Sequence, residues 1–306
     1  MLDLCIVGAP KCGTSSLFQW LTAHPQISGP ENGKELFFFM DEGHPLTKEP
    51  NIHTSDLDTY NSLFPDSESG CAVEATTHYL FQDTARKNLA AMESKPLAIA
   101  LLRDPAERVW SSFQYTRNNF AHIDPSLSFT QYVECVLHGE AERVTDNINH
   151  AGSAYVLARD VEYSAYVKHL RPWREAVGKD RLIVLNFDTL ATSPEDMCLR
   201  MAAELGVDES FYDDFDFRAC NATYRPLSHS LQSLARSINR RMPEGLAKDM
   251  AKYAYKTLCT SPALAEKTEK DRRALEQLRK YYGPYNERLS DEFDVSVAEW
   301  MTTEGQ

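Results

Sequence analysis

Continuous apolar runs dominate the pattern of hydrophobic and polar residues along this chain. They cover residues 4–7, 97–102 and 181–187, and they lack the polar alternation of a half-exposed strand. Runs of this kind are typical of strands buried on both faces of a parallel sheet. Apolar residues at helical spacing follow, and the pattern predicts helices over residues 163–173 and 193–205. The alternation predicts an α/β fold of P-loop type, with a mainly parallel sheet between two layers of helices.

The first apolar run leads into a turn bounded by two glycines. Gly8 and Gly13 stand five residues apart, as in nucleotide-binding loops, where backbone N–H groups and a helix N-terminus hold a phosphate. Thr14 follows the second glycine where those loops carry a lysine, and the cation in this turn is Lys11. The turn therefore favours a phosphorylated donor other than ATP or GTP. The alternative is an ordinary strand-to-helix turn with a hydroxyl cap.

The second apolar run ends at Arg103, where a helix is predicted to begin. Asp104 suits the N-cap position, and Glu107 three residues later completes a capping-box pattern. At about 100° per residue, one arc of this helix is polar and can face a ligand. The residues of this polar arc are Arg108, Ser111 and Tyr115. Because ligands of open α/β sheets bind at the carboxyl ends of strands, Arg103 and the Gly8–Gly13 turn can reach one crevice.

These two segments resemble the donor-binding motifs of sulfotransferases that use 3′-phosphoadenosine-5′-phosphosulfate (PAPS) and release 3′-phosphoadenosine-5′-phosphate (PAP). The stretch Pro10–Leu17 is similar to the 5′-phosphosulfate loop, and Arg103–Ser111 is similar to the 3′-phosphate motif. The resemblance implies a set of PAPS-binding residues, namely Lys11, Cys12, Gly13, Thr14, Ser15, Ser16, Arg103 and Ser111, with Arg225 from a loop that closes over the nucleotide.

The segment that carries Lys34 and Glu35, followed by three phenylalanines, resembles the heparan sulfate sulfotransferases. The resemblance implies that Glu35 is the general base and that Lys11 offsets charge on the leaving phosphate. These enzymes usually carry a lysine where this chain has Ala75, so Lys34 or His78 is a candidate replacement. The alternatives are that Glu35 pairs with a neighbouring lysine and that His78 is a hydrogen-bonded structural residue.

Charge and composition narrow the class of acceptor. The 306 residues carry a formal net charge of −13, so the average surface repels polyanions and offers no nucleic-acid footprint. A neutral glycan or a small molecule is the expected acceptor, and no His/Cys spacing predicts a metal. No linker or repeat divides the chain, which predicts one domain over residues 1–306. The absence of a signal peptide, of a membrane span and of paired cysteines predicts a cytoplasmic protein.

Two other functions remain open at this point. One is a P-loop kinase or NTPase whose lysine is displaced to Lys11, although no magnesium-binding partner is evident. The other is a nucleotide-binding interaction protein without catalysis, which the alanine at position 75 favours. The oligomeric state is not predicted.

Overall fold

The computed structural model describes residues 1–65, 70–218, 225–226, 260–261 and 266–301. Contacts along the chain group the residues into two compact units. The first unit contains residues 1–109, 159–221 and 275–306, and the second contains residues 110–158 and 222–274. The single domain expected over residues 1–306 stays a prediction.

A five-stranded sheet forms the centre of the first unit. Its strands are β1 (Leu2–Gly8), β2 (Ile27–Ser28), β3 (Cys71–Glu74), β4 (Leu97–Leu102) and β5 (Leu182–Asn186). They lie in the order β2-β3-β1-β4-β5, and each pair is parallel. The parallel sheet predicted from the apolar runs is confirmed.

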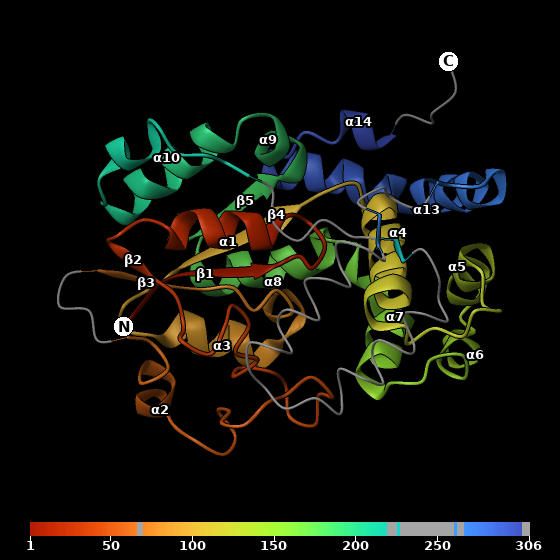
Figure 1. The fold of residues 1–306 in the computed structure, drawn as a ribbon, viewed down its shortest axis with the longest axis horizontal. Helices are drawn as coiled ribbons and strands as arrows, with labels where there is room; N and C mark the ends of the chain where they lie inside the picture. Colours follow the sequence, from red (N-terminus) through yellow and green to blue (C-terminus); the bar gives the residue numbers. More distant parts are fainter. Residues whose placement is uncertain (66–69, 219–224, 227–259, 262–265, 302–306) are drawn as a thin grey trace. The chain divides into compact units, whose positions relative to one another are not determined.

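Helices cover both faces of this sheet. On one face lie α1 (Thr14–Thr22), α9 (Phe187–Thr192) and α10 (Pro194–Leu205), and on the other lie α3 (Asp83–Ala91) and α8 (Val167–Val177) (Figure 1). The shorter elements of this unit are α2 (Leu57–Asn61), η1 (Tyr79–Phe81), η3 (Glu209–Tyr212) and α14 (Ala298–Met301). The predicted three-layer α/β fold is therefore confirmed.

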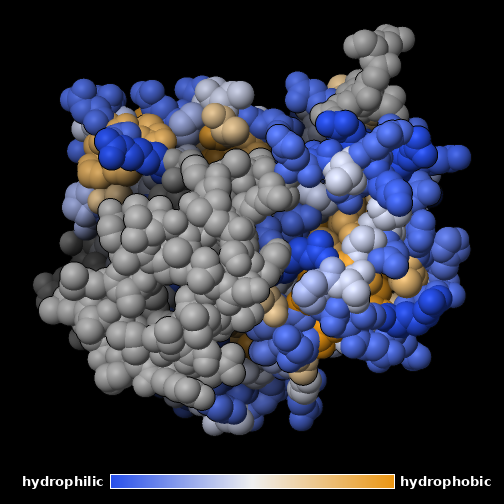
Figure 2. Space-filling model, turned by 45° about the vertical axis from the view of Figure 1, so that its right-hand side comes forward, coloured by the Kyte–Doolittle hydropathy of each residue, from blue (hydrophilic) through white to orange (hydrophobic). Residues whose placement is uncertain are grey.

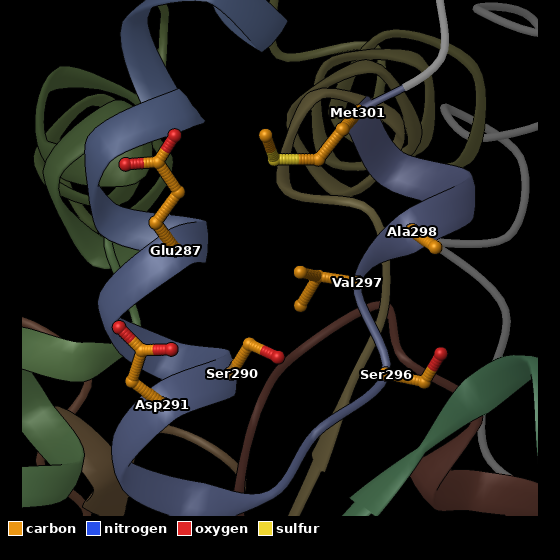
Figure 3. A pocket seen from close by; sticks show the side chains of 7 residues that line it. All are labelled: Glu287, Ser290, Asp291, Ser296, Val297, Ala298 and Met301. Atoms are coloured by element: carbon orange, nitrogen blue, oxygen red, sulfur yellow. The ribbon is translucent and has the colours of Figure 1, made fainter.

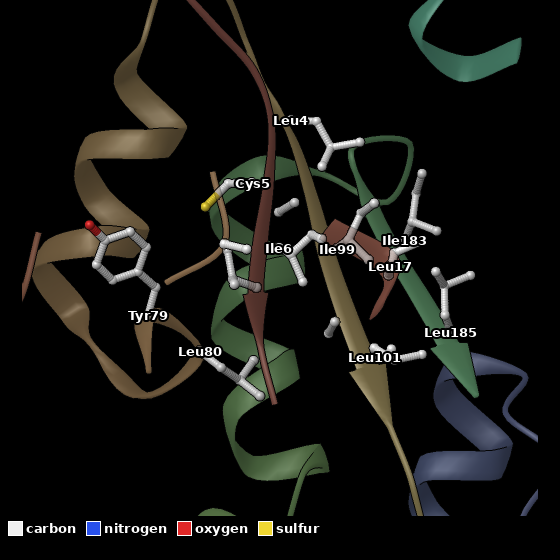
Figure 4. Packing of buried hydrophobic residues seen from close by; sticks show 14 of the residues in the cluster. Leu4, Cys5, Ile6, Leu17, Tyr79, Leu80, Ile99, Leu101, Ile183 and Leu185 are labelled. Atoms are coloured by element: carbon white, nitrogen blue, oxygen red, sulfur yellow. The ribbon is translucent and has the colours of Figure 1, made fainter. Parts of the chain in front are cut away.

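The core of the sheet is built from branched side chains in register. Ile6 of β1, Ile99 of β4 and Ile183 of β5 form one row, since Ile6 pairs with Ile99 and Ile99 pairs with Ile183. Leu17 of α1 belongs to the same buried cluster (Figure 4). Burial of each such side chain contributes about 1.5–3 kcal/mol. This packing fixes the carboxyl ends of β1, β3 and β4 at one edge of the sheet.

The helix expected over residues 163–173 is wrong at its start. Helix α7 (Ala151–Tyr163) ends at Tyr163, and α8 begins at Val167. The Ser164 hydroxyl donates to the Asp160 carbonyl at 2.8 Å and accepts from Arg108 at 3.1 Å. A serine that satisfies a helix carbonyl in this way competes with the backbone, which explains the break. The helix predicted through residue 205 is confirmed, because Gly206 ends α10 with a φ of 67°.

The described part of the second unit is mainly helical. It contains the π-helix η2 (Thr116–Phe120), α5 (Phe129–Leu137), α6 (Ala141–Thr145) and the two-stranded antiparallel ladder of β6 (Arg225–Pro226) with β7 (Thr260–Ser261). The long helices α4 (Pro105–Tyr115), α7 and α13 (Glu269–Phe293) begin in one unit and end in the other. Ser128 and Gln131 form a reciprocal capping box that starts α5.

Hydrophilic residues prevail among the described residues on the face drawn in Figure 2, with apolar side chains in smaller patches between them. Within the described ranges, no helix combines the length and the hydropathy that a bilayer span needs. The cytoplasmic location stays a prediction.

Candidate active site

The turn between β1 and α1 has a geometry that suits an anion. Gly13 precedes the first helical residue, and its φ of 85° lies in the left-handed region that favours glycine. A Cβ atom here would approach Phe187 and Leu190 to 2.8 Å. Within the described residues, no side chain caps the start of α1. The Ser16 N–H already donates to the Gly13 carbonyl at 3.0 Å, so the N–H groups of Thr14 and Ser15 are the ones that suit a negatively charged ligand.

Lys34 connects this turn to the candidate base. Its Nζ donates to Thr14 Oγ1 and to Ser15 Oγ, both at 3.2 Å. The same Nζ lies 3.6 Å from Glu35 Oε1. Burial lowers the pKa of Lys34, and the neighbouring Glu35 carboxylate opposes this shift. One lysine thus contacts the start of the anion-binding helix and the carboxylate expected to take a proton.

Glu35 is held on two sides. The Thr77 hydroxyl donates to Glu35 Oε1 at 2.8 Å, in addition to the ion pair with Lys34. The Lys48 ammonium donates to the Glu35 carbonyl at 3.4 Å. The pairing of Glu35 with Lys34, which the sequence left as an alternative to a role as base, is therefore present. The side chain of Glu35 keeps 30% of its surface exposed, so the pairing leaves it accessible.

Lys11 and Arg103 bring positive charge to the same turn. Arg103 Nη1 donates to the Lys11 carbonyl at 3.3 Å, and its guanidinium lies 4.9 Å from the centre of the Phe187 ring. Arg103 Nε is buried without a hydrogen-bond partner among the described residues. Burial lowers the pKa of Lys11 to about 7, and the charges of Arg103 and Lys34 add to this shift. An anionic ligand would compensate this concentration of charge.

Tyr166 joins the two donor-binding segments. Its hydroxyl donates to the Arg103 carbonyl at 3.1 Å and lies 3.8 Å from Cys12 Sγ. The Cys12 thiol is buried and also contacts the Pro10 carbonyl at 3.7 Å. Cys12 therefore shapes the turn from inside, and Ser16 is likewise buried in the first turn of α1.

The polar arc expected on the helix after Arg103 needs a correction. Asp104 caps this helix as predicted, since its Oδ1 accepts from the Ala106 N–H at 2.8 Å. Arg108, however, is fully buried and pairs with Asp160 at 2.7 Å. A buried arginine must have a partner, because an unpaired charge in the interior costs several kcal/mol. Arg108 therefore belongs to the interior and does not face a ligand.

His78 lies four residues after the end of β3 and directly before η1. Both ring nitrogens are buried, and neither has a hydrogen-bond partner among the described residues. Burial lowers the pKa of His78 to about 4, although the Glu35 charge acts in the opposite direction. The imidazole is thus neutral at neutral pH. The alternative of a hydrogen-bonded structural histidine is not what the described residues show.

The roles of all the predicted donor-binding residues stay predictions, and for two of these residues the described part of the structure adds no contact at the turn. Ser111 is partly exposed on α4 and belongs to the second unit, whereas Arg103 belongs to the first. The backbone of Arg225 lies in β6, and its side chain is outside the described part of the structure. Their roles stay predictions.

A groove between α13 and α14 is a poor site for a nucleotide. Its lining consists of Glu287, Ser290, Asp291, Ser296, Val297, Ala298 and Met301 (Figure 3). Two carboxylates and no cation among these residues would repel phosphate. Across the described ranges, no three His, Cys, Asp or Glu side chains lie close enough to hold a metal.

Several residues of the site are not evident from the sequence. Thr77 and Tyr166 contact Glu35 and Arg103 from positions 42 and 63 residues away along the chain. A usable signal is the hydroxyl pair Thr76–Thr77, which begins two residues after the end of β3, since strand ends carry ligand-facing groups in this fold. Nothing comparable marks Tyr166.

Comparison with known proteins identifies sulfotransferases as relatives of this chain. The family model described as "Sulfotransferase domain" matches residues 2–256. The bifunctional heparan sulfate N-deacetylase/N-sulfotransferase 1 of Caenorhabditis elegans is 26% identical over 248 residues, which is 79% of this chain and 26% of that protein. Its Homo sapiens counterpart is 27% identical over 212 residues, or 67% of this chain and 22% of that protein. The chain thus spans about a quarter of the length of these relatives.

A solved structure shares the fold. The crystal structure of a sulfotransferase from Alicyclobacillus acidocaldarius matches with a TM-score of 0.66 and 20% identity, and the match covers 99% of each chain.

Proposed function

Because the chain belongs to the sulfotransferase domain family, we propose that it transfers the sulfuryl group of PAPS to a hydroxyl or amine of a neutral glycan or small molecule. The observation that carries this proposal is the position of Lys34. Its ammonium contacts two hydroxyls at the start of α1 and the Glu35 carboxylate. The Lys34 ammonium therefore contacts both the helix start expected to bind the donor and the carboxylate expected to act as base.

The residues around the turn fit a nucleotide with separate 5′ and 3′ anionic groups. The start of α1, with Thr14 and Ser15, would hold the 5′ group, since it offers hydroxyls and N–H groups beside two lysines. Arg103, whose Nε is buried without a hydrogen-bond partner among the described residues, would hold the 3′-phosphate. PAPS supplies an activated sulfuryl group on a phosphate leaving group. Lys11 and Lys34 would offset the charge that develops on this leaving group.

Glu35 would act as the general base. An alcohol is a poor nucleophile until its proton is removed, and a fixed carboxylate within reach of that proton accelerates the transfer about 10²–10⁴-fold. Thr77 and Lys34 orient this carboxylate by contacts of 2.8 and 3.6 Å. The neutral His78 imidazole, with both nitrogens unpartnered among the described residues, would hydrogen-bond the acceptor. Its low pKa makes it a weaker base than a free histidine.

A neutral acceptor is favoured by two observations. The chain has 45 acidic and 32 basic residues, so its average surface repels a polyanion. It also has Ala75 in place of the lysine expected by resemblance to the heparan sulfate enzymes. The names of the two relatives specify heparan sulfate, and we propose a different acceptor class for this chain.

Ligand binding and sulfate transfer test this proposal. Thermal-shift titrations with PAP, ADP and ATP should show the largest stabilisation by PAP, because only PAP carries both anionic groups without a triphosphate. Stabilisation by ATP above that by PAP would support the kinase alternative. Radiolabelled PAPS should then be supplied with a neutral hexose, glucosamine, a phenol and N-desulfated heparin. Strong PAP binding without transfer to any acceptor would favour the non-catalytic alternative.

A further inference from the structure

The segment that follows Glu35 is anchored in an unusual way. Four successive backbone amides each donate to a side-chain hydroxyl, and they belong to Leu36, Phe37, Phe38 and Phe39. Thr76 Oγ1 accepts the first two, at 2.9 and 3.2 Å. The Tyr79 hydroxyl accepts the last two, at 3.0 and 3.1 Å. Two hydroxyl groups therefore satisfy all four amides.

Both hydroxyls depend on one buried carboxylate. A hydroxyl that accepts two amide protons still has one proton to donate. Thr76 donates its proton to Glu74 Oε1 at 2.5 Å, and Tyr79 also hydrogen-bonds to Glu74. Tyr60 donates to Glu74 Oε2 at 2.5 Å. Glu74 has no exposed surface, so no water competes for these three hydroxyls.

The anchored segment is strained, which explains why it needs so many bonds. Phe37 has a φ of 54°, in the left-handed region that bulky side chains rarely adopt. Such a conformation persists only where the surroundings determine it, and here the hydrogen bonds of Thr76 do so. Ala75 and Thr77, which also follow β3, hold the two residues that come before the strained segment, Lys34 and Glu35. The Ala75 N–H donates to the Lys34 carbonyl at 3.2 Å, and Thr77 holds the Glu35 carboxylate.

We propose that Glu74 is a positioning residue for sulfuryl transfer. It fixes the positions of Glu35 and Lys34 through the hydroxyls of Thr76 and Tyr79. This inference rests on the proposed role of Glu35 as base. Glu74 is fully buried and hydrogen-bonds to Thr76, Tyr79 and Tyr60, so it would act through the segment it anchors.

The ionised form of Glu74 is the one that accepts three hydroxyl protons, so this arrangement has a pH dependence. Burial raises the pKa of Glu74 to about 7. The other titratable groups that face it are Cys5, opposite Glu74 in the sheet, and the two tyrosines Tyr60 and Tyr79. Burial raises the pKa of each, so all three are neutral near pH 7. Protonation of Glu74 would remove one acceptor and loosen the anchor.

The test compares three variants by amide hydrogen exchange and by turnover. Thr76→Val removes the hydroxyl at constant shape, Thr76→Ser retains it, and Glu74→Gln removes the charge. Exchange at Leu36 and Phe37 should accelerate at least about tenfold in Thr76→Val, because those amides lose their acceptor, and should stay near wild type in Thr76→Ser. Turnover with radiolabelled PAPS and glucosamine, or the best acceptor of the panel above, should fall at least about tenfold in Thr76→Val and recover in Thr76→Ser. The Kd for PAP should change much less than turnover, since Lys11 and Arg103 lie outside the anchored segment.

Glu74→Gln supplies the pH readout. In the wild type, turnover should rise through about pH 7 as the anchor forms, and this rise should be absent in Glu74→Gln. Normal turnover in a folded Thr76→Val protein would overturn the positioning role. Unchanged exchange at the two amides would overturn the anchor itself. Full activity of Glu35→Gln would instead refute the base, and the exchange result would still decide whether Glu74 anchors the segment.

Discussion

The ionisation of Lys11 couples directly to donor binding. Burial and the charges of Arg103 and Lys34 lower the pKa of Lys11 from 10.5 to about 7 in the free protein. An anionic 5′ group bound in the turn should restore the ammonium form, because an opposite charge within about 4–6 Å favours it. Binding of PAP above pH 7 should therefore take up one proton.

The size of this effect follows from the pKa. With a pKa of about 7, Lys11 carries its proton in roughly one free molecule in ten at pH 8 and in roughly one in a hundred at pH 9. Each pH unit above about 7 should thus weaken PAP binding about tenfold, or about 1.4 kcal/mol. The phosphate groups add little to this slope above about pH 7.5, since their second ionisation lies near about 6.

Isothermal titration calorimetry between about pH 7.5 and 9.5, in two buffers of different ionisation enthalpy, measures both affinity and proton uptake. Lys11→Arg is the matched control, because a guanidinium stays charged throughout this range. Its PAP affinity should be nearly independent of pH. A flat wild-type profile, or the same slope in Lys11→Arg, would refute the assignment of Lys11 to the donor site.

Three further predictions concern Arg103, Lys34 and Glu74. Arg103→Ala should weaken PAP binding by about 2 kcal/mol or more and ADP binding much less, because a charge-assisted bond to the 3′-phosphate is lost. Titration with both nucleotides measures the two losses, and equal losses would contradict this role of Arg103. Lys34→Ala should lower kcat about 10- to 100-fold with a smaller effect on PAP affinity, and unchanged turnover would remove Lys34 from the mechanism. Because the pKa of Glu74 is raised from 4.5 to about 7 on folding, the free energy of unfolding should fall as pH rises through this window. The fall should be at most about 3 kcal/mol in urea titrations and absent in Glu74→Gln; an identical fall in Glu74→Gln would assign it to other groups.

Three strands of the sheet and the turn after β1 are local features that the sequence predicts, whereas β2 and β3 are not among the predicted apolar runs. The apolar runs at residues 97–102 and 181–187 become β4 and β5, and Asp104 caps α4 as its position indicates. Each of these features depends on neighbours within a few residues, for which spacing and residue type are sufficient information.

The fine structure of the site depends on contacts between residues far apart in the chain. Arg108 lies on a predicted polar arc, yet it is buried and pairs with Asp160, which is 52 residues further along the chain. The anchor of the Glu35 segment likewise requires Tyr60 and Tyr79, which are ordinary aromatic residues in the sequence. Helical periodicity predicts which face of a helix is polar. It does not predict whether a buried residue of opposite charge packs against that face.

Turnover of Glu35→Gln tests the central claim most directly. The variant keeps the size of the side chain and loses the ability to take up a proton, so kcat for transfer from radiolabelled PAPS should fall roughly 10²–10⁴-fold while PAP binds normally. Glu31→Gln, at an exposed position four residues earlier, is the matched control and should behave as wild type. Normal turnover of Glu35→Gln would contradict the account, and loss of activity in His78→Ala instead would assign the proton transfer to the histidine.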